Sequence, residues 1–383
     1  MATKKQIKYP YEFDPKKRKL AKVYTKVKII NSIINSIIIP IAFLILFVVF
    51  GGHVWLQGVV FSVTLEFLLQ IPIYAFILSI FLVIVQFPLS FYSSFIYEHK
   101  YGLSNYKLTG WFKDFFKEEL VYFIFFLPAI TVLYYLIGLT PLWWLYAGII
   151  FAVVATILDF IMPVILLPFF YKLEPYKDEI QKKKLLAMIR KAGVKNLNTV
   201  LVAKESEKSK KPNAMFTGFG KTKRMILFDT LLDSFTPDEI ETVIGHELGH
   251  YVHRDSIKGL LIEIVLMFPI LFVISLLLPP PTVSYIHIIA TIPLFILYHS
   301  IIDLILMPFI NTHSRRIEKQ ADIFALDVSR KPDAQISTEK RLADMALGDD
   351  SPHPLIETIL FTHPMVKKRI KTCVEWKQKN KKV

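Results

Sequence analysis

Residues 143–170 read WWLYAGIIFAVVATILDFIMPVILLPFF and contain a single charged side chain, Asp159. A helix of about 20 apolar residues crosses the ~30 Å hydrocarbon core of a bilayer, so this segment predicts a membrane-spanning helix. Five more segments share its character: residues 29–50, 67–92, 120–139, 260–278 and 285–310. The sequence therefore predicts a mainly α-helical, polytopic membrane protein with about six transmembrane helices.

The composition of the whole chain agrees with a membrane protein. Hydrophobic residues make up 53% of the 383 residues and charged residues only 20%, which is below the share usual in soluble domains. The net charge of +14 is of a kind seen in nucleic-acid-binding proteins, but the Lys and Arg residues flank the apolar segments. That placement is typical of contact with anionic lipid. We therefore expect a lipid bilayer, and no nucleic acid, as a partner. The single cysteine, Cys373, excludes internal disulfides and cysteine-based zinc sites.

The charges of the connecting segments predict the side of the membrane that each one faces. Residues 1–28 contain ten Lys or Arg residues, whereas residues 51–66, 140–142 and 279–284 contain none. Because Lys and Arg gather on the cytoplasmic side, we expect both termini and the insert after the fourth span to be cytoplasmic. The membrane would be the inner membrane of a bacterium or the endoplasmic reticulum of a eukaryote. The expected domains are a basic tail (1–28), spans one to four (29–171), a soluble insert (172–257), spans five and six (258–310) and C-terminal helices (311–383).

The insert has the pattern of a small α+β domain. Residues 178–192 read as an amphipathic helix, and residues 199–203, 213–219 and 224–229 read as short strands. The apolar face of this helix is expected to consist of Ile180, Leu185, Leu186 and Ile189. A second helix has clear start signals, because Thr236 is a good N-cap, Pro237 suits the first helical position and Glu239 completes a capping box.

This second helix carries the strongest chemical signal in the chain, His246-Glu247-Leu248-Gly249-His250. Residues four apart lie on the same helix face, so both imidazoles can bind one zinc ion. Glu247 can then take a proton from a zinc-bound water as that water attacks a peptide carbonyl. The alternative is a surface helix with two incidental histidines, and these five residues alone do not decide between the two.

A catalytic zinc needs a third protein ligand and one open position. The candidates are Glu318, Asp322, His299, His313 and His363. Glu318 fits best, because it lies just beyond the sixth span on the same side as the histidine motif. Asp322 follows one helical turn later and can accept a hydrogen bond from a ligand imidazole. A solvated helix face is the alternative for this charged stretch. Together with the histidine motif, the stretch favours one zinc ion per chain.

In combination these motifs resemble the CaaX prenyl protease 1 family, which comprises membrane zinc endopeptidases that trim prenylated proteins. The resemblance rests on the metal motif, on four spans before it and two after it, and on residues 314–322. Other matching stretches are residues 98–104, 168–175, 213–215, 223–232 and 362–364, followed by Arg369. Two departures stand out. The extra N-terminal helix of eukaryotic members is not expected here, which indicates a six-span, prokaryotic-type member, and Met215 stands where an aromatic residue often follows Asn-Ala.

The resemblance also implies roles for individual residues. The insert would be a zincin-like catalytic domain whose edge strand, Asn213-Ala214-Met215, binds the substrate backbone by strand addition. His363 and Arg369 would approach the zinc and stabilise the oxyanion, while a simple His-Pro turn is the alternative for His363. The spans would enclose a water-filled chamber. Acids within the apolar segments are expected to face it: Asp159, Glu263 and Asp303.

These expectations define one enzyme and two rivals. The chain is expected to be a monomeric metalloendopeptidase that removes C-terminal residues from prenylated CaaX proteins or peptides. A broad quality-control protease that clips membrane proteins without any prenyl group is an alternative of the same class. A catalytically inactive transporter or scaffold is an alternative of a different class, and the presence of Glu247, Glu318 and Asp322 argues against it.

Overall fold

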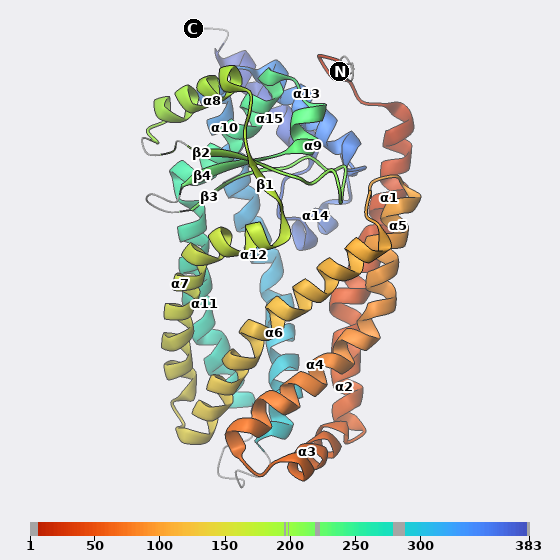
Figure 1. Cartoon of the computed structure of the whole chain (residues 1–383), viewed down its shortest axis with the longest axis vertical. Helices are drawn as coiled ribbons and strands as arrows, with labels where there is room; N and C mark the ends of the chain where they lie inside the picture. The colour runs from red at the N-terminus through yellow and green to blue at the C-terminus, as the bar shows by residue number, and fades with distance from the viewer. Residues whose placement is uncertain (1–6, 195–196, 198, 219–222, 279–287, 381–383) are drawn as a thin grey trace.

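The computed structural model describes residues 7–194, 197, 199–218, 223–278 and 288–380. Long apolar helices lie beside one another, and a small sheet lies at one end of them, together with both termini (Figure 1). In the described residues six helices are long and apolar enough to cross a membrane, which confirms the predicted number. They are Pro15–Val49, Phe67–Lys100, Leu108–Leu139, Trp143–Ile161, Asp255–Leu277 and Ile289–Ser329.

Several of these spans consist of consecutive helical segments, and one short helix joins the first two spans. In chain order the elements are α1 (Pro15–Ile33), the π-helix η1 (Ile34–Ile38), α2 (Ile39–Val49), α3 (Gly52–Val63), α4 (Phe67–Phe91), the π-helix η2 (Tyr92–Ile96), α5 (Tyr97–Lys100), α6 (Leu108–Leu139), α7 (Trp143–Phe170), α11 (Asp255–Leu277), the 3-10 helix η5 (Ile289–Thr291) and α12 (Ile292–Ser329). Helix α3 occupies the connection that contains no Lys or Arg.

Three helices extend beyond the apolar stretches that predicted them. Helix α1 begins at Pro15, within the expected tail, because the Asp14 side chain caps it by accepting from the backbone N–H of Lys16 at 2.8 Å. Helix α6 begins at Leu108 rather than at residue 120, and α12 continues to Ser329 rather than ending at residue 310. The charged residues in these extensions are good helix formers, so hydropathy marks the apolar part of each helix and not its ends. The predicted start of the sixth span, residue 285, lies outside the described residues.

The insert forms a four-stranded sheet with the order β1-β2-β4-β3. Its strands are β1 (Leu173–Pro175), β2 (Thr199–Ala203), β3 (Ala214–Thr217) and β4 (Arg224–Phe228). Strand β2 runs parallel to β4, and the two outer pairs are antiparallel. The three predicted strands are therefore confirmed within one or two residues, apart from residue 219, which lies outside the described residues. Strand β3 stands at the edge of the sheet, as expected.

Helix α8 (Glu179–Lys191) covers the sheet with a narrower apolar face than predicted. Leu185 and Ile189 are fully buried, but Ile180 is 75% exposed, so its assignment to that face is wrong. At 3.6 residues per turn, Ile180 lies about 140° around the helix from Leu185 and on the side opposite Ile189. The spacing of five residues therefore excludes it from the face that Leu185 and Ile189 define.

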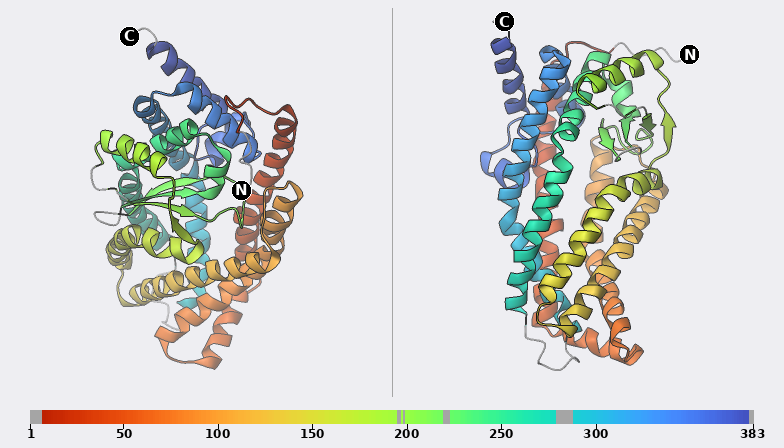
Figure 2. Two further views of the ribbon diagram at one scale, coloured as in Figure 1. Left: turned by 45° about the horizontal axis from the view of Figure 1, so that its top comes forward. Right: turned by 90° about the vertical axis from the view of Figure 1, so that its left-hand side faces the viewer.

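The remaining helices lie at the same end of the molecule as α10 (Pro237–His253), and of these α13 packs against it (Figure 1). They are α9 (Asp229–Ser234), α13 (Pro332–Met345), α14 (Pro354–Leu360) and α15 (Val366–Asn380). Helix α10 contacts β3 on one side and α12 and α13 on the other, so it lies between the sheet and the C-terminal helices (Figure 2). The same end of the molecule therefore contains the histidine motif, the edge strand and the end of the sixth span.

The segment before the first span is bound to this end of the molecule. The Tyr11 hydroxyl and the Arg18 guanidinium both donate to the buried Asp344 carboxylate of α13. The Tyr11 backbone N–H donates to Ser337 at 2.7 Å, and the Arg341 guanidinium lies over the Tyr11 ring. Part of the expected basic tail is thus fixed to a helix that packs against α10.

Candidate metal centre

The start of α10 fixes the rotation of the helix. The Thr236 side chain accepts from the backbone N–H of Glu239, and the Glu239 carboxylate accepts from the Thr236 N–H at 2.8 Å, which confirms the predicted capping box. Glu239 is fully buried and also accepts from the Ser337 hydroxyl at 2.7 Å. Because the first turn is held in this way, the face that carries His246 and His250 is directed toward α12.

Two glycines let α10 and α12 approach almost to backbone contact. A Cβ at Gly245 would lie 3.1 Å from the Cα of Ala325, and a Cβ at Gly249 would lie 3.0 Å from the Cα of Ala321. Carbon atoms in good contact are about 3.5–4.0 Å apart, so no larger side chain fits at either place. This close packing brings Glu318 of α12 within reach of both histidines.

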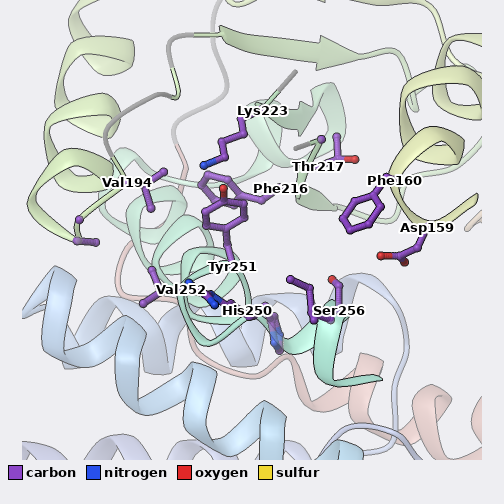
Figure 3. Close-up of a pocket in the computed structure, with 15 residues that line it drawn as sticks. Asp159, Phe160, Val194, Phe216, Thr217, Lys223, His250, Tyr251, Val252 and Ser256 are labelled. Carbon is purple, nitrogen blue, oxygen red and sulfur yellow. The ribbon is translucent and has the colours of Figure 1, made fainter. Parts of the chain in front are cut away.

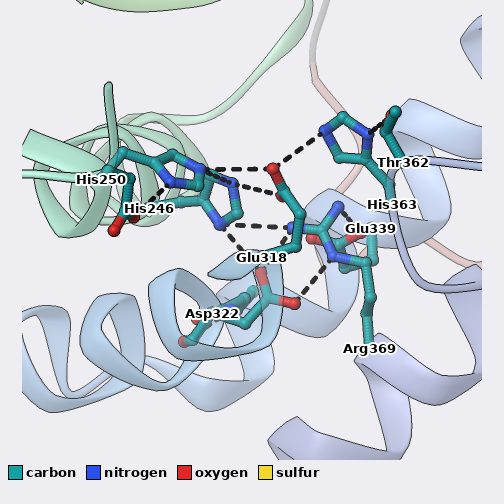
Figure 4. A network of polar contacts seen from close by, with 10 residues as sticks. His246, His250, Glu318, Asp322, Glu339, Thr362, His363 and Arg369 are labelled. Atoms are coloured by element: carbon teal, nitrogen blue, oxygen red, sulfur yellow. Dashed lines mark hydrogen bonds and ion pairs between the residues drawn. The ribbon is translucent and has the colours of Figure 1, made fainter. Parts of the chain in front are cut away.

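The three predicted ligands meet in one triangle (Figure 4). The Nε2 atoms of His246 and His250 are 3.2 Å apart. The Glu318 carboxylate lies 3.2 Å from the Nε2 of His246 and 3.5 Å from the Nε2 of His250. Tetrahedral ligands at about 2.0–2.1 Å from a zinc ion are about 3.3 Å from one another. The three separations are therefore close to those expected within such a coordination sphere, with Oε2 of Glu318 facing His246 and Oε1 facing His250.

Carboxylates behind the two imidazoles fix their tautomers. The Nδ1 of His246 donates to Asp322 at 2.9 Å, and the Nδ1 of His250 donates to Asp255 at 3.0 Å. An ionised carboxylate only accepts, so each Nε2 presents a lone pair to the triangle. The two Nε2 atoms that carry these lone pairs are 3.2 Å apart. Beside them, the buried Oε2 of Glu318 receives no hydrogen bond from the described residues. This arrangement fits a bound cation. Two imidazoles and one carboxylate also form a donor set that zinc prefers in hydrolases.

The contact of Asp322 with His246 was predicted, whereas Asp255 was not. Asp255 follows Arg254, whose φ of 58° ends α10 in the left-handed region. The turn between α10 and α11 places the Asp255 carboxylate 3.0 Å from the Nδ1 of His250. The usual signal for such a helix end is glycine, and an arginine in its place gives no sign of the turn in the sequence.

The electrostatics of the centre favour a positive charge. Burial alone would lower the pKa of His246, but the neighbouring carboxylates of Asp322 and Glu318 outweigh it and raise the pKa to about 10, so the Nε2 readily takes up a cation, either a proton or a metal ion. Burial raises the pKa of the Glu247 carboxyl above its ordinary value. A carboxylate whose pKa lies nearer neutrality is a better general base. The arrangement can therefore hold a cation and place a base beside it.

Comparison with known families accounts for this geometry. The sequence model of peptidase family M48 matches residues 175–377. The chain belongs to this family. A second model, described as the CAAX prenyl protease N-terminal region with five membrane helices, matches residues 5–172. Together with the six apolar helices, these matches show a multi-pass membrane metalloendopeptidase of the CAAX prenyl protease type, as the motifs predicted.

Individual relatives and one solved structure agree with this assignment. The uncharacterized metalloprotease YhfN of Bacillus subtilis (strain 168) is 30% identical, over 79% of this chain and 72% of its own length. The CAAX prenyl protease 1 homolog of Homo sapiens is 25% identical, over 81% of this chain and 74% of its own length. The crystal structure of S. mikatae Ste24p has a TM-score of 0.84 at 22% identity and covers 97% of this chain and 92% of that chain, so the two share a fold.

Two more predicted site residues of the M48 chain lie beside the triangle. The Nε2 of His363 is 3.4 Å from the Glu318 carboxylate, and its side chain is 61% exposed. The Arg369 guanidinium lies behind the ligands, where it pairs with Asp322 and with Glu339. Sequence reasoning missed Glu339, because no motif surrounds it. The catalytic roles of His363 and Arg369 stay predictions.

The edge strand borders a small cavity next to Glu247. This cavity has a volume of about 160 Å³ and is lined by Asn213 and Ala214 together with His246, Glu247 and His363. The start of β3 therefore lies beside the histidine motif, and the role of Asn213, Ala214 and Met215 in substrate binding stays a prediction. The side chain of Met215 packs in the hydrophobic cluster of Ala203, Ile226 and Phe228 instead.

A larger cavity of about 720 Å³ lies beside His250 (Figure 3). It is lined by Phe216 and Thr217 of β3, by His250, and by Asp159 near the end of the fourth span. Asp159 therefore faces a cavity, as expected. Glu263 and Asp303 are exposed, and Asp303 pairs with His299 at 2.9 Å. The predicted chamber itself stays a prediction.

Proposed function

We propose that the M48 chain is a zinc endopeptidase in which His246, His250 and Glu318 hold one metal ion and Glu247 is the general base. The observation that carries this proposal is the cluster formed by the two Nε2 atoms and the Glu318 carboxylate, in which each Nε2 lies 3.2–3.5 Å from the other Nε2 and from one Glu318 oxygen. Its dimensions, its Nδ1-protonated imidazoles and the buried Glu318 oxygen suit zinc.

The chain's own residues then divide the work of hydrolysis. A zinc ion bound at the triangle would polarise the scissile carbonyl and lower the pKa of its water to about 7. Glu247, next to His246 on α10, takes the proton of the attacking water and delivers it to the leaving amine. Asp322 and Asp255 accept from the Nδ1 N–H groups of the ligand imidazoles, which orients each ring with its Nε2 toward the metal and makes that nitrogen a stronger ligand.

His363 is the best donor for the oxyanion. Its Nε2 lies 3.4 Å from the Glu318 carboxylate, and an imidazole can donate an N–H in either protonation state. Thr362 contacts its Nδ1 at 2.9 Å. Arg369 is saturated by two carboxylates, so its charge reaches the centre chiefly through Asp322.

The substrate backbone binds to the free edge of β3. In the edge strand Asn213-Ala214-Met215 alternate backbone groups face away from β4 and are offered for strand addition, whereas the Asn213 carbonyl accepts from the Phe228 N–H of β4 at 3.1 Å. Strand addition recognises a peptide without demanding particular side chains. The cavities of about 160 Å³ and 720 Å³ lie at the two ends of this strand and receive substrate side chains on either side of the scissile bond. This arrangement supports an endopeptidase that accepts many sequences.

We propose that the substrates are cytoplasmic and include prenylated CAAX-type C-termini, from which a monomeric enzyme in the bilayer removes the terminal residues. The N-terminal CAAX prenyl protease match and the naming of the human relative support this substrate class. The positive-inside distribution of Lys and Arg supports the sidedness. A quality-control protease with no lipid requirement is the second candidate, because the Bacillus relative is described only as a metalloprotease.

One peptide pair separates the two candidates. The same CAAX-terminated peptide is supplied to the purified protein with and without a farnesyl group, and Glu247→Gln serves as the inactive control. A CAAX-type enzyme cleaves the farnesylated peptide with a kcat/KM at least tenfold higher. Equal cleavage of both peptides assigns the quality-control role, and no cleavage of either peptide or of an unstructured protein contradicts the proposed activity.

A further inference from the structure

One buried carboxylate beside the metal centre has no role in the mechanism above. Glu339, on α13, is only 3% exposed, and its Oε2 accepts from the Nη1 of Arg369 at 2.7 Å (Figure 4). It also lines the small cavity that contains Glu247 and His363. A buried charge is costly unless it is paired, so the position of Glu339 calls for a physical reason.

The reason lies in how Arg369 is held. Its Nε and Nη2 donate to the two oxygens of Asp322, and its Nη1 donates to Glu339 on the other side. One guanidinium is thus shared by two carboxylates. Burial raises the pKa of Glu339 to about 7, and when both acids are ionised the three side chains together carry one net negative charge. Their side chains are 13%, 2% and 4% exposed, in the order Arg369, Asp322 and Glu339, so water screens these interactions little.

Asp322 also serves the metal centre. The same Oδ1 that accepts from Arg369 accepts from the Nδ1 of His246 at 2.9 Å. An arginine that neutralised Asp322 fully would make this oxygen a weaker acceptor for the imidazole. A second anion that draws on the guanidinium limits this neutralisation.

We propose that Glu339 is a positioning residue that shares Arg369 with Asp322 and thereby keeps Asp322 a strong acceptor for His246. The inference rests on the proposed zinc site and adds a residue to it that lies outside the metal motif and outside α12. Glu339 acts through two intervening side chains, Arg369 and Asp322, and does not itself contact the ligands.

The variant Glu339→Gln tests this inference, because it removes the charge and keeps the volume. Two effects then act in the same direction: Arg369 draws more strongly on Asp322, and one negative charge near the cation is lost. The zinc dissociation constant should rise about tenfold, at the low end of the range for residues that support metal ligands. The acid limb of the kcat/KM profile should move down by roughly half a pH unit, because a more positive centre acidifies the attacking water.

The control is Asp333→Asn, at the start of the same helix. Asp333 is 62% exposed and pairs with Lys377, so its substitution removes a charge from α13 without touching Arg369. Zinc affinity and the acid limb should stay unchanged in this variant. Glu339→Asp keeps the charge and should return the acid limb toward the wild-type position, which a merely structural role would not produce.

A double variant covers the case in which Glu339→Gln does not fold. Glu339→Gln combined with Arg369→Met removes both charges, so this double variant should bind zinc more tightly than Glu339→Gln alone. If Glu339→Gln does not fold, the zinc affinity of the double variant is compared with that of Arg369→Lys, and the double variant should again bind zinc more tightly. Wild-type zinc affinity and an unshifted acid limb in Glu339→Gln would overturn the inference. Absence of zinc from the wild-type protein would instead overturn the proposed function, so a chelator titration of the wild type is measured first.

Discussion

The two proposed ligand histidines depend on acids in different surroundings. Asp322 is almost fully buried and is shared by His246 and Arg369. Asp255 supports His250 and has the half-exposed Lys258 as its other partner, at 3.3 Å. The support for His246 is therefore less screened by water than the support for His250.

Replacing either acid should weaken the metal site to a different degree. Asp322→Ala should raise the zinc dissociation constant by about 10- to 100-fold. Asp255→Ala should have a smaller effect, because the cation that it releases, Lys258, is half exposed to water, whereas the buried Arg369 that Asp322 holds lies 3.4 Å from the Nδ1 of His246. Chelator competition on the purified variants measures both constants.

The control is Asp327, an exposed acid on α12, the helix that also carries Asp322. Asp327 accepts from the Trp376 indole N–H and lies more than two helical turns after Glu318. Asp327→Ala should leave zinc affinity at the wild-type value. An unchanged dissociation constant in Asp322→Ala would reduce Asp322 to a structural carboxylate.

The site residues that sequence could predict are those that follow a local period. His246 and His250 are four apart, as are Glu318 and Asp322, so each pair shares a helix face. Glu339 could not be predicted in this way, because its contact with Arg369 joins two helices that meet only through tertiary packing. Long-range ion pairs of this kind leave no pattern in the neighbouring residues.

At the scale of elements, the contact of α10 with α12 decides whether the ligands meet. Gly245 and Gly249 place the two backbones so close that a Cβ at Gly249 would be 3.0 Å from the Cα of Ala321. Neither helix can move outward without separating Glu318 from the histidines. Gly245 and Gly249 therefore matter because they let α10 and α12 pack closely, and not because glycine makes the backbone flexible.

Gly249→Ala should force the two helices apart. The expected cost is about 1–3 kcal/mol of stability, as for other overpacked sites, together with weaker zinc binding as Glu318 recedes. Thermal unfolding in detergent and chelator titration give the two values. Gly259→Ala on α11 is the matched control, because a Cβ there meets no atom within 4 Å. A Gly249→Ala protein with wild-type stability and zinc affinity would contradict the packing argument.

The element boundaries show where sequence reasoning stops. The apolar content of the spans predicted their number, but α12 continues through a charged stretch to Ser329 and carries Glu318 on the same helix as the sixth span. A charged stretch that stays helical cannot be distinguished from a loop by hydropathy. Strand β1 has only three residues, which is too short to show an alternating pattern.

At the scale of the whole molecule, the segment before the first span is tied to the catalytic end. Asp344 accepts from Tyr11, from the backbone N–H of Asp14 at 2.8 Å and from Arg18, and its side chain is fully buried. Because α13 also carries Glu339, the position of this segment bears on the network behind the metal centre.

Asp344→Asn should release this segment. Loss of the buried charge leaves Arg18 unpaired, and breaking such a pair costs about 3–5 kcal/mol. The variant should unfold at a lower temperature and become sensitive to proteolysis between residues 8 and 20. Lys340→Gln removes the more exposed pair with Glu12 on the same helix and should cost at most about 1 kcal/mol. Equal stability of the two variants would contradict a fixed N-terminal segment.

The central claim is that one zinc ion is held by His246, His250 and Glu318 while Glu247 supplies the base. Elemental analysis of purified protein, combined with peptide cleavage, tests it most directly. The account predicts one zinc per chain in the wild type and in Glu247→Gln, with cleavage lost only in the latter. It also predicts that Glu318→Gln retains far less zinc. A wild-type protein with no zinc, with two ions per chain, or with full zinc content after Glu318→Gln would contradict the account.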